Sequence, residues 1–265
     1  MEFWREALIV VAGLWAGTIN TIVGSGSLVT FPVLVALGYA PVNAIISNAM
    51  GLVAGGFSGA WGYRREAASV PRTLLKLLPV SLLGGLAGAF LLLHLPEEVF
   101  GYVAPVLILV AVLLVIFQPR LSAWSKRRQD MEHVAPEEAD RLRLPPVLYV
   151  LVFLIGVYGG YFTAAQGILL MGVLGIFFHG SLQQSNAIKV ILSLAVNLIA
   201  ACSYLLFAFG RINWLVVLLI AVGSLVGGLI GARIGRRLSP FWLRGVIVVL
   251  GVVALATMVS KLINA

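Results

Sequence analysis

Charge and cysteine are scarce in this sequence, and each scarcity excludes a class of protein. Only 11% of the 265 residues are charged and 61% are hydrophobic, whereas a soluble domain carries about a quarter charged residues. A soluble chain of this length could not bury so much apolar surface. The single cysteine, Cys202, lies in an apolar block, which excludes a disulfide framework and a thiolate metal cluster.

Acidic residues are missing from the whole second part of the chain. No Asp or Glu occurs between residues 141 and 265, and none lies in the middle of an earlier apolar segment. Because cation transporters usually place a carboxylate at membrane depth, the sequence disfavours cation transport and a carboxylate proton relay. The net charge of +8 indicates no nucleic-acid partner, since Lys and Arg lie in short loops where they set membrane orientation.

What the sequence has instead is a series of long apolar blocks, most of which have the length that crosses about 30 Å of hydrocarbon. They cover residues 7–38, 42–62, 73–93, 98–118, 147–179, 186–209, 213–235 and 241–262. A charged stretch at 119–146 separates two groups of four. The sequence therefore predicts a first membrane repeat at 1–118, a linker at 119–146 and a second membrane repeat at 147–265.

The two groups match each other without a gap at a constant offset of 143 residues. The matching residues are Gly13, Gly17 and Gly24 with Gly156, Gly160 and Gly167, Asn43-Ala44-Ile45 with Asn186-Ala187-Ile188, and Ser81-Leu82-x-Gly84-Gly85-Leu86-x-Gly88-Ala89 with Ser224-Leu225-x-Gly227-Gly228-Leu229-x-Gly231-Ala232. Three clusters in one register indicate an internal duplication.

Loop charge predicts that the two repeats are inverted in the bilayer, because cytoplasmic loops are enriched in Lys and Arg. The connection at 62–73 is basic, whereas the one at 94–98 carries Glu97 and Glu98. In the second repeat the basic connection is 236–241, which corresponds to the acidic one of the first. This places the linker in the cytoplasm and both termini outside, with Arg211 as the one loop charge that does not fit.

Inversion requires an odd number of crossings in each repeat, and three single segments already supply them. The segments 7–38 and 147–179 must then enter and leave on the same side. At about 1.5 Å per residue each is too long for one crossing, and each has glycines near its middle. The predicted fold is an all-α integral membrane protein of two inverted-topology repeats, each a glycine-broken helical hairpin followed by three transmembrane helices.

The hairpin breaks are the candidate substrate site. Unwound backbone there exposes N–H groups and hydroxyls at membrane depth, and helix N-termini at such breaks attract anions. Alternatively, small residues only permit close helix packing, which we prefer for Gly84, Gly85 and Gly88 and leave open at the breaks. The candidate substrate-binding residues are Asn20, Thr21, Gly24, Ser25, Gly26, Ser27, Asn48, Gln166, Gly167, Ser185, Asn186 and Lys189.

Lys189 is the one charge placed clearly inside an apolar segment. Burying it costs at least about 2.5–3.5 kcal/mol, so it should face a cavity or a partner. Its counterpart in the first repeat is Ile46, so the duplicated scaffold does not require it. Contact with a substrate and extension to the cytoplasmic surface both remain open.

Enzyme activity is not expected. Gly24-Ser25-Gly26 faintly resembles an intramembrane serine protease loop, but a nucleophile needs a base within hydrogen-bond reach. His94 and His179 lie near predicted segment ends, and His133 lies in the linker. Converging metal ligands are missing as well, so we expect no catalytic residue, no metal site and no cofactor.

The run Ala16-Gly17-Thr18-Ile19-Asn20-Thr21-Ile22-Val23-Gly24-Ser25-Gly26-Ser27, followed by Pro32 and Gly38, resembles the TauE/SafE sulfite exporter family of bacterial membrane permeases. Gly156-Val157-Tyr158-Gly159-Gly160 and Gln166-Gly167 echo it more loosely in the second repeat. There Ile168, Leu169 and Leu170 replace the equivalents of Ser25, Gly26 and Ser27, so the two hairpins should not bind a substrate identically.

The resemblance implies a secondary transporter, mostly an exporter, in the bacterial inner membrane. Its implied partners are the lipid bilayer and a small sulfur-containing anion such as sulfite, thiosulfate or an organosulfonate, with a homodimer as one arrangement. An anion-selective channel and a non-transporting membrane assembly subunit are the alternatives that the sequence leaves open.

Overall fold

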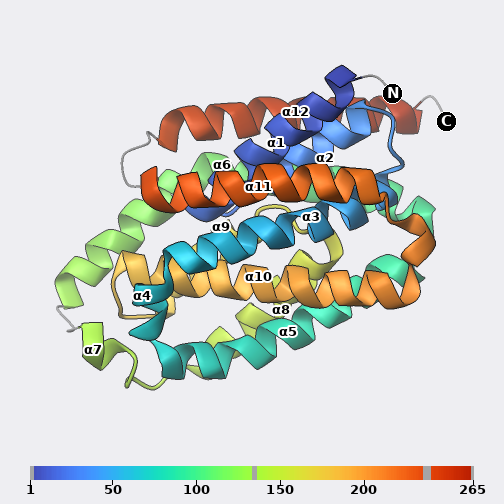
Figure 1. Cartoon of the computed structure of the whole chain (residues 1–265). Coiled ribbons are helices and arrows are strands. Elements are labelled where there is room, and N and C mark those ends of the chain that lie inside the picture. Colours follow the sequence, from blue (N-terminus) through green and yellow to red (C-terminus); the bar gives the residue numbers. More distant parts are fainter. Residues whose placement is uncertain (1–2, 133–135, 235–239, 264–265) are drawn as a thin grey trace.

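The computed structural model describes residues 3–132, 136–234 and 240–263, which are helical with short connections and contain no strand (Figure 1). The first part holds α1 (Phe3–Ile22), α2 (Ser27–Ala36), α3 (Pro41–Gly62), α4 (Arg64–Ala68), α5 (Pro71–His94) and α6 (Glu97–Glu132). The second holds α7 (Pro136–Ala139), α8 (Pro146–Phe162), α9 (Gln166–Phe177), α10 (Leu182–Phe207), η1 (Phe209–Arg211), α11 (Trp214–Ile234) and α12 (Pro240–Ile263). The all-helical fold is thus confirmed.

The helix starts follow from local sequence. Proline stands at the start of α3, α5 and α8, where its missing N–H costs nothing because the first helical amides have no intrahelical partner. At the start of α10, the Ser181 hydroxyl accepts from the Gln184 amide while the Gln184 side chain accepts from the Ser181 amide. This reciprocal capping satisfies two amides that the helix leaves open.

Both long apolar segments are helical hairpins, as the repeat and their length predict. The first is broken between α1 and α2 at Gly24, whose φ of +89° suits glycine. The second is broken between α8 and α9 at Thr163 and Ala165, with φ of 61° and 57°. A glycine break therefore holds for the first hairpin only. In the second hairpin, non-glycine residues adopt the strained left-handed conformation.

Four helical spans are long and apolar enough to cross a membrane: Pro71–His94, Glu97–Arg120, Leu182–Phe207 and Trp214–Arg233. By length and composition these spans indicate a multi-pass membrane protein. Helices α3 and α12, at the other two predicted crossings, are not among them, and the apolar part of α12, Ile247–Ser260, is shorter. Helix α6 continues beyond the apolar span into the predicted linker, as far as Glu132.

Each hairpin packs against a helix of the other half through small residues. A Cβ added to Gly17 on α1 would lie 2.3 Å from the carbonyl oxygen of Ser224 on α11. A Cβ added to Gly88 on α5 would lie 2.1 Å from the carbonyl oxygen of Val157 on α8. An added Cβ would lie 2.3 Å from the Phe153 carbonyl oxygen at Gly84 and 2.9 Å from the Ile199 Cγ2 at Gly85. The packing role expected for these glycines is therefore confirmed.

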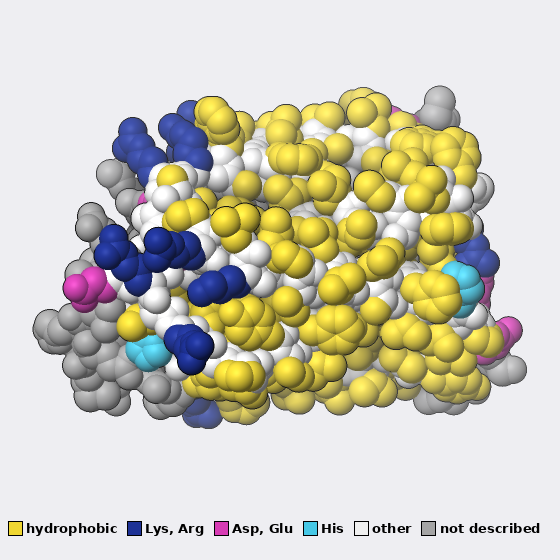
Figure 2. Space-filling view, turned by 90° about the horizontal axis from the view of Figure 1, so that it is seen from below, with side chains coloured by type: hydrophobic (Ala, Val, Ile, Leu, Met, Phe, Trp, Pro, Cys, Tyr) yellow, Lys and Arg dark blue, Asp and Glu magenta, His cyan; other side chains and the backbone are white. Residues whose placement is uncertain are grey.

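Lys and Arg side chains gather at one end of the molecule (Figure 2). We call it the basic end. It holds α4 and the ends of the neighbouring helices, with Arg64, Arg65, Arg72, Lys76 and Arg233. Helix α1 begins and α12 ends at the opposite end (Figure 1).

Asp140, just after α7, caps a helix of the membrane domain. Its carboxylate accepts from the amides of Arg72 at 3.1 Å and Thr73 at 2.8 Å in the first turn of α5. The residue is only 6% exposed. It therefore fastens this end of the 119–146 stretch to the bundle, because a carboxylate satisfies open amides and complements the helix dipole.

We expect Asp140→Ala to lower the free energy of unfolding by about 1–2 kcal/mol, since a helix of the bundle loses its cap. Equilibrium unfolding in detergent measures the change. The matched control is Glu138→Ala, because Glu138 is exposed and accepts no hydrogen bond from a described helix start. Equal stability of the two variants would show that the Asp140 cap contributes nothing.

Candidate functional site

The two hairpin tips touch at residues that the duplication makes equivalent. The Gly167 amide donates to the Gly24 carbonyl oxygen at 3.0 Å. A Cβ added to either glycine would lie 2.5 Å from the Cα of the other. No side chain fits at this contact, and it brings the N-terminal ends of α2 and α9 together inside the bundle.

Helix α2 presents open amides at this meeting point. The first backbone hydrogen bonds of α2 are donated by the Leu28 amide to the Ser25 carbonyl oxygen at 3.1 Å and by the Val29 amide to the Gly26 carbonyl oxygen at 2.9 Å. Among the described residues, the amides of positions 25–27 find no acceptor, and no side chain caps α2 or α9. Uncapped helix N-termini carry partial positive charge, which favours an anion.

A buried network fixes α2 against α3. The side-chain Nδ2 of Asn48 donates to the Ser27 hydroxyl at 3.0 Å. The Thr30 hydroxyl donates to the Oδ1 of the same Asn48 side chain. Asn48 is fully buried. Two hydrogen bonds to one buried side chain hold the short helix α2 at a defined depth and rotation.

Three side chains of the candidate site have polar atoms without a partner. The hydroxyls of Ser25 and Ser185 and the Nε2 of Gln166 are buried, and no described residue accepts from them. Ser25 is 1% and Gln166 is 3% exposed. Because buried polar atoms are almost always hydrogen-bonded, the unmatched donors of Ser25 and Gln166 at the hairpin tips fit a site whose missing partner is an acceptor.

Lys189 does not extend to the surface. It is 1% exposed, and its ammonium donates to the carbonyl oxygens of Thr21 at 2.9 Å and Ile22 at 3.5 Å and to Asn186 Oδ1 at 3.2 Å. The two carbonyls end α1, where the helix leaves acceptors open and the dipole favours a cation. Lys189 therefore holds the hairpin tip of the first half on α10 of the second half.

The candidate residues fall into two groups. The tip group comprises the two contacting glycines, their neighbours and the residue that binds Ser27: Gly24, Ser25, Gly26, Ser27, Gln166, Gly167 and Asn48. Asn20 borders this group, because a Cβ added to Gly26 would lie 2.9 Å from the Asn20 Cβ. Thr21, Asn186 and Lys189 form the lysine group. Ser185 lies one turn before Lys189 on α10, and no described contact joins it to the tips.

Ser193 and Asn197 are buried polar residues of α10 that the sequence interpretation missed, although it included Ser185 and Lys189 of the same helix. Ser185, Lys189, Ser193 and Asn197 recur every fourth position of α10, which places them along one helix face. All four are buried, and the Ser193 hydroxyl and Asn197 Oδ1 have no partner among the described residues. This spacing was available as a signal. Tyr204 was also missed, and no pattern in the sequence indicates that its hydroxyl donates to the Gly160 carbonyl oxygen at 3.1 Å.

Comparison with known proteins finds membrane transporters. The family described as "Sulfite exporter TauE/SafE" matches residues 9–258. The "Probable membrane transporter protein" of Haemophilus influenzae is 25% identical over 222 residues, 83% of this chain and 81% of the relative. The "Probable membrane transporter protein ORF9" of Sinorhizobium sp is 26% identical over 227 residues, 84% of this chain and 80% of the relative.

A further relative matches over a shorter stretch. "Probable membrane transporter protein YfcA" of Escherichia coli K12 is 26% identical over 161 residues, so the match spans 60% of this chain and about half, 55%, of the relative. No solved structure gave a significant match. The family match covers most of the first hairpin, the whole second hairpin and the four described helical spans that are long and apolar enough to cross a membrane. The chain belongs to the sulfite exporter TauE/SafE family of membrane transporters.

Proposed function

We propose that the chain is a secondary transporter, working as an exporter, of a small sulfur-containing anion such as sulfite, thiosulfate or an organosulfonate. The observation that carries the proposal is the set of hydrogen-bond donors without acceptors beside the uncapped starts of α2 and α9. The name of the sulfite exporter family supports the choice of a sulfur oxyanion over other anions.

The donor set suits an oxyanion. Ser25, Gln166 and the amides of positions 25–27 can together donate to all the oxygens of a pyramidal or tetrahedral anion. Each helix N-terminus adds roughly half an elementary positive charge. Because this positive potential is modest, the anion is stabilised in the site and is still able to leave.

The burial of the site supports a transporter more than an open channel. Ser25, Ser27, Asn48 and Gln166 are all nearly inaccessible to solvent. An anion could reach them only after the hairpins or the helices around them move, which is the behaviour of an alternating-access protein. A constitutively open pore would expose these side chains.

We further propose that the chain lies in the bacterial inner membrane as two inverted repeats, 1–118 and 147–265. A cytoplasmic linker at 119–146 joins them. The reciprocal packing of α1 on α11 and α8 on α5 supports a symmetric pair of repeats. The basic end supports a cytoplasmic location for α4 and the linker, with both termini outside. Arg211, the exception in loop charge, pairs with Glu97 at 3.2 Å.

We expect Ser25→Ala to lower sulfite affinity and flux about 10- to 100-fold, the effect of removing one hydrogen bond to a charged group. A thermal-shift panel of sulfite, sulfate, thiosulfate, taurine and sulfoacetate on purified protein identifies the ligand, and flux into proteoliposomes measures transport. The control is Ser203→Ala, because the buried Ser203 hydroxyl already donates to its own helix at Ile199 O, 2.9 Å.

Two outcomes would count against the proposal. Full flux by Ser25→Ala would place the anion elsewhere in the bundle. Unchanged melting temperature with every anion of the panel would favour an assembly subunit that transports nothing.

A further inference from the structure

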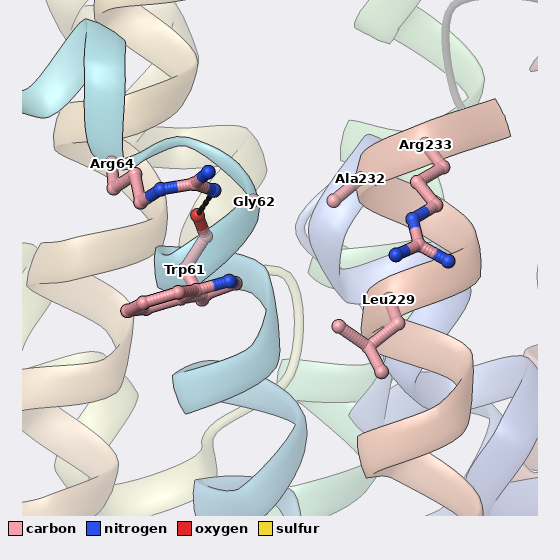
Figure 3. A pocket seen from close by; sticks show the side chains of 6 residues that line it. All are labelled: Trp61, Gly62, Arg64, Leu229, Ala232 and Arg233. Atoms are coloured by element: carbon pink, nitrogen blue, oxygen red, sulfur yellow. Dashed lines mark hydrogen bonds between the residues drawn. The ribbon is translucent and has the colours of Figure 1, made fainter.

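A cleft of about 280 Å³ lies at the basic end, between the last turns of α3 and α11 (Figure 3). Its lining residues are Trp61, Gly62, Arg64, Leu229, Ala232 and Arg233. The two helices are closely packed here, since a Cβ added to Gly62 would lie 2.2 Å from the Ala232 Cβ. The cleft therefore sits over a fixed contact between the two halves of the chain.

Two guanidinium groups flank this cleft, and no acidic residue lines it. The Arg64 guanidinium lies 4.7 Å from the centroid of the Trp61 ring and donates to the Trp61 carbonyl oxygen at 2.9 Å. These contacts fix its position and leave further N–H donors free. Figure 3 shows the Arg64 guanidinium above the Trp61 ring on one side of the cleft and the Arg233 guanidinium along α11 on the other.

The surface next to the cleft is apolar and exposed. On α3, Phe57 and Trp61 are exposed at a spacing of four, and Arg64 follows Trp61 by three. On α11, Val222, Val226 and Leu229 form a similar exposed stripe that Arg233 ends four residues later. Such stripes face hydrocarbon in a membrane protein, and each of them ends in an arginine at the cleft.

We propose that this cleft binds the phosphate group of an anionic phospholipid, whose acyl chains lie along the two apolar stripes. Paired arginines match phosphate oxygens by bidentate hydrogen bonding, and basic pockets between membrane helices recognise lipid headgroups. A free anion would use the charges but not the exposed Trp61 and Leu229. Bound there, the lipid bridges α3 of the first half and α11 of the second.

Native mass spectrometry of the purified chain in neutral detergent tests the site, with phosphatidylglycerol, phosphatidylcholine and inorganic phosphate as separate probes. We expect phosphatidylglycerol to bind at least about tenfold more tightly than phosphatidylcholine. Arg64→Gln and Arg233→Gln should each weaken its binding about fivefold, and the double variant about 25-fold, because one basic residue contributes about that factor.

The matched control is Arg65→Gln, since Arg65 is exposed on α4 next to Arg64 and does not line the cleft. Its phosphatidylglycerol binding should equal that of the unmodified chain. Unchanged binding by the double variant, at an unchanged melting temperature, would overturn the proposal. Displacement of phosphatidylglycerol by equimolar inorganic phosphate would assign the cleft to a free anion and also overturn it.

Discussion

Replacing Gly24 by alanine is expected to abolish transport and to destabilise the bundle by more than an ordinary surface substitution. A Cβ at this position would lie 2.5 Å from the Gly167 Cα and 2.7 Å from its carbonyl carbon. Neither is a flexible side-chain atom, so the two hairpin tips would have to separate. The left-handed φ of +89° adds a backbone cost of about 1–2 kcal/mol.

Two further glycines separate these effects. Gly38 has a φ of +90° with nothing within 4 Å of an added Cβ, so Gly38→Ala should show the backbone cost alone and keep transport. Gly167→Ala adds the clash without a left-handed backbone. Melting temperature and proteoliposome flux should rank Gly38→Ala as the mildest change. Transport by Gly24→Ala equal to that of Gly38→Ala would mean that the tip contact is dispensable.

Lys189→Met should cost at least about tenfold in flux and lower the melting temperature. The change leaves the Thr21 and Ile22 carbonyls buried without their charged donor, and an unsatisfied buried acceptor costs about 1–3 kcal/mol. It also removes the buried cation from the end of the hairpin that carries the proposed site.

Lys189→Arg retains the charge and should keep part of both properties, which distinguishes loss of charge from loss of shape. The control is Lys76→Met, because Lys76 is exposed at the basic end. If Lys189→Met matched the control in flux and melting temperature, the contact between α10 and the first hairpin would have no role.

The hairpins could be predicted because two signals agreed. The segments 7–38 and 147–179 are too long for single crossings, and the repeat of 143 residues pairs their glycines. The same register pairs Gly24 with Gly167, the residues that meet at the tips. Repetition could not show that the equivalent residues touch, since contact depends on how the two halves associate.

Other features depend on tertiary contacts that periodicity does not carry. The repeat places the break of the second hairpin next to Gly167, but the left-handed backbone at Thr163 and Ala165 is not one that either residue favours. The partners of Lys189 are main-chain carbonyls of a distant helix. Any residue presents a carbonyl, so no side-chain pattern in the sequence could identify them.

Counterflow in proteoliposomes tests most directly whether this chain is a secondary anion transporter with its site at the hairpin tips. Vesicles loaded with unlabelled sulfite and diluted into labelled sulfite should accumulate label transiently and saturably, and Ser25→Ala should reduce this accumulation at least about tenfold. Flux that neither saturates nor rises with internal sulfite is the behaviour of a pore and would contradict the transporter. Undiminished counterflow by Ser25→Ala would contradict the site.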